Sequence, residues 1–77
     1  MSERAVREII ALIAVELEIP ESRLSAASST DTTPEWDSVG HLNICLAIQD
    51  RYGVSLDMDA IGELTSVAAL AALIDKT

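Results

Sequence analysis

Apolar residues recur at intervals of three and four along four stretches of this 77-residue chain, at about residues 2–17, 37–53, 57–64 and 65–76. This is the spacing of residues on one face of an α-helix. None of these helices buries its apolar face alone, so they must pack on one another. We therefore expect an all-α fold: a small four-helix bundle of three longer helices and one short helix, in a single domain over residues 1–77.

Residues that commonly cap helix N-termini stand at the start of all four stretches. These residues are Ser2, Asp37 or Ser38, Asp57, and Thr65 or Ser66. Gly53 is typical of a residue just past a helix C-terminus, and Pro20 lies beyond the end of the first helix. The capping residues and the apolar periodicity therefore predict similar boundaries for the four helices.

A long connection separates the first two helices. Residues 18–36 are rich in Ser, Thr and Pro and have no apolar periodicity. Loops of this length in small domains are usually functional, or are held to the body by a few apolar residues. We expect Leu24 and Trp36 to hold this loop.

The second helix has more apolar surface than one neighbouring helix requires. At roughly 100° per residue its apolar residues cover about 220°; they are Val39, Leu42, Ile44, Cys45, Leu46, Ile48 and Tyr52. The remaining strip, which we expect to face solvent, contains Gly40, Asn43, Ala47, Asp50 and Arg51. Such a helix is either central in the bundle or uses an apolar edge for another purpose.

The charge balance limits the possible partners. The chain carries 13 acidic against 5 basic residues, a formal net charge of −8. This charge disfavours nucleic acid and anionic membranes and favours basic partner surfaces. The N-terminus is too polar for a signal peptide, no apolar run approaches a membrane span, and the single Cys45 forms no internal disulfide. We expect a cytoplasmic protein, and nothing in the sequence requires more than a monomer.

The residues with catalytic potential are few. Ser38 and His41 lie three apart on one helix, but a hydrolase also needs an orienting carboxylate, an oxyanion hole and a cleft. We interpret His41 as a partly buried histidine and Cys45 as a buried structural thiol, with no cation placed to activate it. One histidine with scattered carboxylates predicts no metal site. These residues indicate that the chain is not an enzyme.

Ser38 has a second interpretation. A serine in the first turn of a helix projects its hydroxyl near unpaired backbone N–H groups and the positive end of the helix dipole. This environment stabilises an attached phosphate. The alternative is that Asp37 and Ser38 only cap the helix.

The segment EWDSVGHLNICLAIQDRYG resembles the region around the modified serine of acyl and peptidyl carrier proteins. Asp37-Ser38-Val39 stands where that family has Asp-Ser-Leu or a close variant at the start of its second helix. Two later segments resemble the family's post-helix turn and the start of its last helix: Gly53-Val54-Ser55-Leu56 and Leu64-Thr65-Ser66-Val67. With the first helix and the long loop, the resemblance covers nearly the whole chain.

The resemblance implies that Ser38 carries a covalent 4'-phosphopantetheine, transferred from coenzyme A by a phosphopantetheinyl transferase. The thiol of this arm would hold an acyl or aminoacyl group as a thioester, which the bundle shelters and presents to acyl-loading and acyl-processing enzymes. Asp37 belongs to the motif. Three residues are expected to face partners or cargo, namely Val39, Leu42 and Leu46, with His41 near the mouth of any cargo cavity.

The second helix departs from the carriers of bacterial fatty-acid synthesis, which resemble one another in an acidic second helix. Here that helix carries Asp50 and Arg51 but few other charges. We therefore expect a specialised carrier that meets dedicated partners through apolar contacts. The alternative is an unmodified helical adaptor that docks a partner through the same apolar edge. The sequence does not indicate the cargo.

Overall fold

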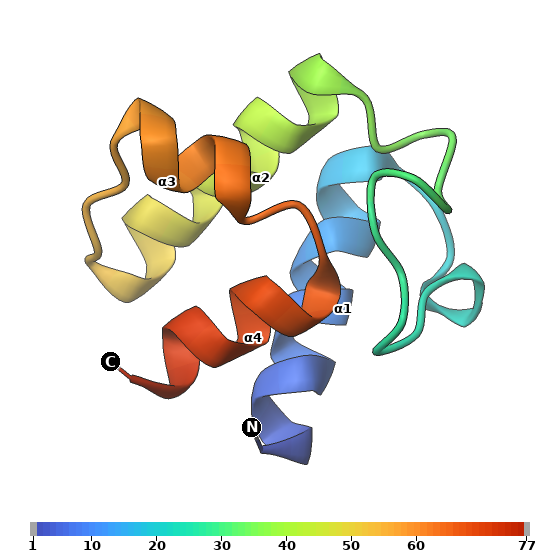
Figure 1. Cartoon of the computed structure of the whole chain (residues 1–77). Coiled ribbons are helices and arrows are strands. Elements are labelled where there is room, and N and C mark those ends of the chain that lie inside the picture. The colour runs from blue at the N-terminus through green and yellow to red at the C-terminus, as the bar shows by residue number, and fades with distance from the viewer. Residues whose placement is uncertain (1, 77) are drawn as a thin grey trace.

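The computed structural model describes residues 2–76 and contains four α-helices (Figure 1). In chain order the elements are α1 (Glu3–Leu17), a short 3-10 turn η1 (Glu21–Arg23), α2 (Ser38–Tyr52), α3 (Met58–Glu63) and α4 (Val67–Asp75). Within residues 2–76 there is no strand beyond one isolated bridge. The predicted all-α bundle, with three longer helices, one short helix and a long first loop, is confirmed.

Each helix N-terminus is capped by a side chain, as predicted. Ser2 Oγ accepts from the amide of Ala5 at 3.1 Å, and Asp57 Oδ1 accepts from the amide of Ala60 at 2.8 Å. The two open alternatives are also resolved. Asp37, not Ser38, caps α2, and Ser66, not Thr65, caps α4.

The core forms where α1 packs against α2 and α4 (Figure 1). Its fully buried aliphatic residues come from all three of these helices: Ile9, Ile13, Ile44, Ile48, Val67 and Leu70. Trp36, which is 2 % exposed, adds a large aromatic side chain from the end of the loop. The short α3 has no buried residue and lies at the periphery of this core.

The loop between α1 and α2 is fixed by residues near and far in the sequence. Leu24 and Trp36 are buried, which confirms their predicted role. The amide of Thr30 donates to the carbonyl of Thr65 at 3.0 Å, and the amide of Val67 donates to the carbonyl of Ser28 at 3.0 Å. These two bonds tie the loop to the α3–α4 connection. The loop therefore presents α2 in a fixed position.

The predicted solvent-facing strip of α2 is wrong at Gly40 and Ala47. Gly40 is buried, and a Cβ atom there would lie 2.7 Å from Leu17 Cδ2, closer than real Cβ contacts. Ala47 is half-buried and packs on the core. Both residues are small because α1 approaches this side of α2, and hydrophobic periodicity does not identify such close approaches.

The described part of the chain contains no helix that is both long enough and apolar enough to span a bilayer.

Candidate functional site

Ser38 is the first residue of α2, and its side chain is exposed. The preceding residue, Asp37, has extended backbone dihedral angles, so the chain enters the helix at Ser38. The buried Trp36 and the close contact of Gly40 with the end of α1 fix this first turn from both sides. The hydroxyl therefore stands on a rigid element at the surface, where another protein has access to it.

The first turn of α2 has two amides without an acceptor among residues 2–76. Asp37 accepts from the amide of Gly40 through Oδ1 at 2.8 Å, and its carbonyl accepts from the amide of His41 at 2.8 Å. The amides of Ser38 and Val39 remain, together with the positive end of the dipole of a 15-residue helix. These groups suit a phosphodiester oxygen beside the Ser38 hydroxyl.

A hollow of about 310 Å³ lies beside Ser38. Its lining comes from the long loop, the start of α2 and the α3–α4 connection: Thr30, Trp36, Asp37, Ser38, His41 and Thr65. The hollow exists because the two backbone hydrogen bonds between the loop and this connection hold Thr30 and Thr65 next to each other. A group attached to Ser38 would therefore have a surface depression within immediate reach.

His41 is buried and bonded through both ring nitrogens. Trp36 Nε1 donates to His41 Nδ1 at 2.9 Å, and His41 Nε2 lies 2.7 Å from the carbonyl oxygen of Ile61. Because the indole N–H is only a donor, Nδ1 must accept, and the proton sits on Nε2 and donates to Ile61. We call this chain of contacts the Trp36–His41–Ile61 bridge. It leaves no ring nitrogen for catalysis, because both are already bonded.

The burial of His41, which is 8 % exposed, separates it from the other residues predicted to face partners. It contributes to the floor of the hollow beside Ser38, and its ring is turned into the protein rather than toward solvent. His41 thus lines the hollow rather than the outer surface of α2, and its place near the mouth of a cargo cavity stays a prediction. The interpretation of His41 as a largely buried histidine agrees with its environment.

Cys45 is fully buried one turn after His41. Its Sγ atom lies 3.6 Å from His41 Nε2, and burial raises the pKa of the thiol. A raised pKa keeps the sulfur protonated and weakly nucleophilic at neutral pH. Cys45 is therefore a structural core residue, as the sequence indicated.

Val39, Leu42 and Leu46 form a row of exposed apolar side chains on α2, which we call the apolar edge. Their exposed fractions are 69 %, 46 % and 52 %. Ile44, Cys45 and Ile48 on the same helix are fully buried. The wide apolar arc thus divides into a core face and an edge that begins next to Ser38.

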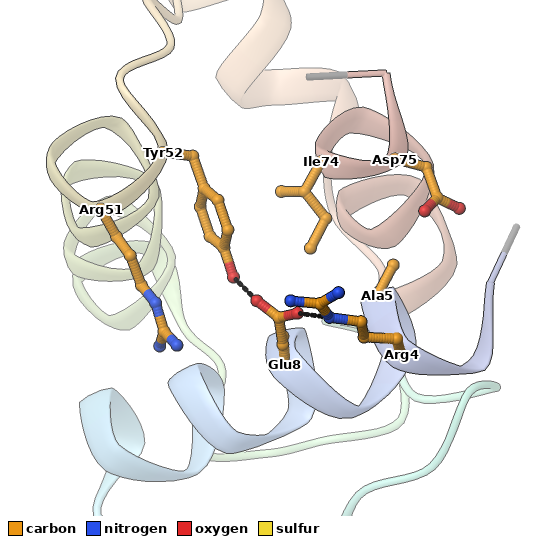
Figure 2. Close-up of a pocket in the computed structure, with 7 residues that line it drawn as sticks. All are labelled: Arg4, Ala5, Glu8, Arg51, Tyr52, Ile74 and Asp75. Atoms are coloured by element: carbon orange, nitrogen blue, oxygen red, sulfur yellow. Dashed lines mark hydrogen bonds and ion pairs between the residues drawn. The ribbon is translucent and has the colours of Figure 1, made fainter.

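A larger hollow, of about 570 Å³, lies at the other end of α2 (Figure 2). Figure 2 shows Tyr52 and Arg4 pointing toward Glu8: the Tyr52 hydroxyl donates to Oε1 at 2.9 Å, and Arg4 Nε donates to Oε2 at 3.0 Å. The Tyr52 hydrogen bond, followed by Arg4, holds the pKa of Glu8 below its ordinary value. These groups satisfy one another and join α1 to the end of α2, roughly 20 Å from Ser38. This hollow is a structural contact and not the candidate site.

No group of three or more His, Cys, Asp or Glu side chains in residues 2–76 is arranged to hold a metal ion.

A comparison of the sequence with models of protein families identifies the family of this chain. The family model described as the phosphopantetheine attachment site matches residues 7–74, which is most of the chain. The chain belongs to this family. Its cofactor is therefore covalently bound 4'-phosphopantetheine, and the chain is a carrier protein of the phosphopantetheine type. A comparison with curated proteins finds no match.

The described residues fit this cofactor. The exposed hydroxyl, the two unpaired amides and the adjacent hollow meet at Ser38. The motif located Ser38 and Asp37, but it did not locate Thr30 and Thr65. These two threonines reach the hollow only through backbone pairing across 35 residues, and no local pattern in the sequence reports that pairing.

Proposed function

We propose that the protein carries acyl or aminoacyl groups as thioesters on a 4'-phosphopantetheine arm attached to Ser38, and presents them to the enzymes of a specialised biosynthetic pathway. One observation supports this most directly: an exposed serine hydroxyl at the first residue of a long helix, in a chain of the phosphopantetheine attachment family. In this proposal the bundle itself catalyses no step.

The attachment is a phosphoryl-type transfer from coenzyme A. A bond forms between Ser38 Oγ and the phosphorus that bears the pantetheine, and the bond from that phosphorus to 3',5'-adenosine diphosphate breaks. The hydroxyl proton leaves to a base of the phosphopantetheinyl transferase or to solvent. The Ser38 and Val39 amides, which lack acceptors among the described residues, would be available to the oxygens of the new phosphodiester.

The test is modification by a promiscuous phosphopantetheinyl transferase with coenzyme A, followed by intact-mass measurement. We expect a gain of one phosphopantetheine unit in the native protein and none in Ser38→Ala. Ser55→Ala is the matched control, because Ser55 is also an exposed serine but lies outside any helix, and it should be modified fully. A native protein that gains no mass, or a Ser38→Ala variant that gains it, contradicts the proposal.

We further propose that partner enzymes recognise the apolar edge of α2 through Val39, Leu42 and Leu46. The edge starts at the residue after Ser38, so an enzyme that acts on Ser38 itself must approach it. α2 carries few charges, so apolar contact rather than charge pairing is available on this helix. An unmodified adaptor would also use this edge, but it gives Ser38 no role.

The transferase is the first enzyme to meet this edge, so its kinetics provide the test. Leu42→Asp should lower kcat/KM for modification by about 10-fold, the effect of losing roughly 1.4 kcal/mol of contact. Met58→Asp is the control, since Met58 is 79 % exposed but lies on α3. It should change kcat/KM by less than about 2-fold. Equal losses in both variants would indicate a general effect of added negative charge.

A further inference from the structure

Two hydrogen bonds attach the α3 segment to α2. His41 Nε2 donates to the carbonyl of Ile61 at 2.7 Å, and the amide of Leu56 donates to Gln49 Oε1 at 2.9 Å. α3 itself spans six residues and has no buried side chain. Its position therefore depends on these bonds together with the flanking Val54 and Leu64, which pack against the core.

The bond to Ile61 satisfies a group that the short helix leaves unpaired. The last carbonyls of a helix have no intrahelical donor, and α3 ends at Glu63, so the Ile61 carbonyl needs another partner. His41 supplies it from α2, and Trp36 holds the His41 ring from the loop side at 2.9 Å. The bridge therefore connects the loop, α2 and α3 in one line of hydrogen bonds.

The bridge lies between Ser38 and the core. The hollow beside Ser38 is closed on its inner side by Trp36 and His41, which are 2 % and 8 % exposed. Beyond them on α2 lie Ile44, Cys45 and Ile48, all fully buried. A group that entered the core from the Ser38 end would have to displace Trp36 or break the His41–Ile61 hydrogen bond.

We propose that the Trp36–His41–Ile61 bridge keeps the cargo outside the helical core, so that the carrier takes short acyl or aminoacyl groups that rest in the hollow lined by Thr30, Trp36 and Thr65. This inference rests on the proposed attachment of the arm to Ser38. It replaces the expectation that the bundle shelters its cargo inside. A long apolar chain has no place here, because it would leave its surface in water.

The experiment varies the length of the cargo. The native protein is loaded from acetyl-, butyryl-, hexanoyl-, octanoyl- and decanoyl-coenzyme A by the promiscuous transferase, and intact mass confirms each product. Thermal unfolding is then measured. A chain that enters the core should raise the Tm by roughly 3–6 °C for each buried methylene. We expect no such rise in the native Tm from octanoyl onward, because methylenes that the hollow does not hold stay in water.

His41→Ala tests whether the Trp36–His41–Ile61 bridge is what keeps the acyl chain out of the core. This variant removes the donor to Ile61 and leaves space beside Trp36, so we expect its Tm to rise with chain length from octanoyl onward. Asn43→Ala is the matched control, since Asn43 lies two residues further along α2 and is exposed. Its Tm should not rise from octanoyl onward, as in the native protein.

A second measurement needs no variant. In the native octanoyl species we expect no nuclear Overhauser contacts between the terminal methyl of the chain and the methyl groups of Ile44 or Ile48. Such contacts, a native Tm that rises from octanoyl onward, or a folded His41→Ala without chain-length dependence in that range would each overturn the proposal. Failure of loading in the mass measurement would instead remove the proposed function, and this inference with it.

Discussion

The two faces of α2 have similar side chains and opposite environments. Ile44, Cys45 and Ile48 are fully buried against the other helices, whereas Val39, Leu42 and Leu46 are about half exposed or more. Apolar character alone does not distinguish a core face from a contact face. The distinction comes from where α1 and α4 pack, and the face they leave open is the one that begins next to Ser38.

The largest difference between the faces should appear in unfolding free energy. Ile48→Ala removes a fully buried side chain, so we expect it to lower the free energy of unfolding by about 2–5 kcal/mol. Leu46→Ala, two residues earlier on the exposed face, should stay within about 0.5 kcal/mol of the native value. Urea unfolding measures both. Similar losses would mean that Leu46 is buried in solution.

Two glycine substitutions compare a tightly packed position on α2 with an open position on α3. Gly40→Ala places a Cβ 2.7 Å from Leu17 Cδ2 and 3.3 Å from the Glu35 carbonyl oxygen. We expect a loss of about 1–3 kcal/mol in unfolding free energy from this overpacking.

Gly62→Ala on α3 is the matched control, because no atom lies within 4 Å of its Cβ position. This variant should gain roughly 0.5–1 kcal/mol from the higher helix propensity of alanine. Thermal unfolding measures whether Gly40→Ala lowers the stability and Gly62→Ala raises it. A Gly40→Ala variant as stable as Gly62→Ala would show that Leu17 moves aside at no cost.

The cap of α2 should have a smaller effect. Asp37→Ala removes the acceptor of the Gly40 amide, and we expect a loss of about 1 kcal/mol in unfolding free energy. Asp37→Asn keeps an acceptor oxygen and should lose much less. If both variants lose the same amount, the charge of Asp37 at the helix N-terminus matters more than its hydrogen bond.

The smallest effect is expected at the Tyr52 end of α2. Tyr52 lowers the pKa of Glu8 below its ordinary value of 4.5, so this contact stabilises the fold at pH above the ordinary value. The contribution is lost as the pH falls through the lowered value. Tyr52→Phe should therefore weaken the dependence of stability on pH below about 4.5, which urea unfolding at several pH values measures. An unchanged slope would contradict the role of Tyr52.

Local patterns in the sequence were sufficient to predict the helices and most of the capping residues. Ser2, Asp57 and Ser66 cap as expected, because a cap depends only on residues within one turn. The burial of Leu24 and Trp36 was also predicted correctly, since a large apolar residue in a polar loop is stabilised by packing on the core.

Contacts between distant segments were not predictable in this way. The burial of Gly40 depends on Leu17, 23 residues earlier, and the bonding of His41 depends on Ile61, 20 residues later. The sequence indicated that His41 is partly buried, but it gave no indication of the carbonyl that the ring meets. Likewise, the hollow beside Ser38 requires Thr30 and Thr65 to be adjacent, and only the folded chain brings them together.

The pairing of the loop with residues 65–67 also has a consequence for timing. During synthesis the ribosome releases Ser38 well before these residues emerge, so the loop lacks its distant hydrogen-bond partners while the chain is still short. The surroundings of Ser38 become complete only when the start of the last helix arrives.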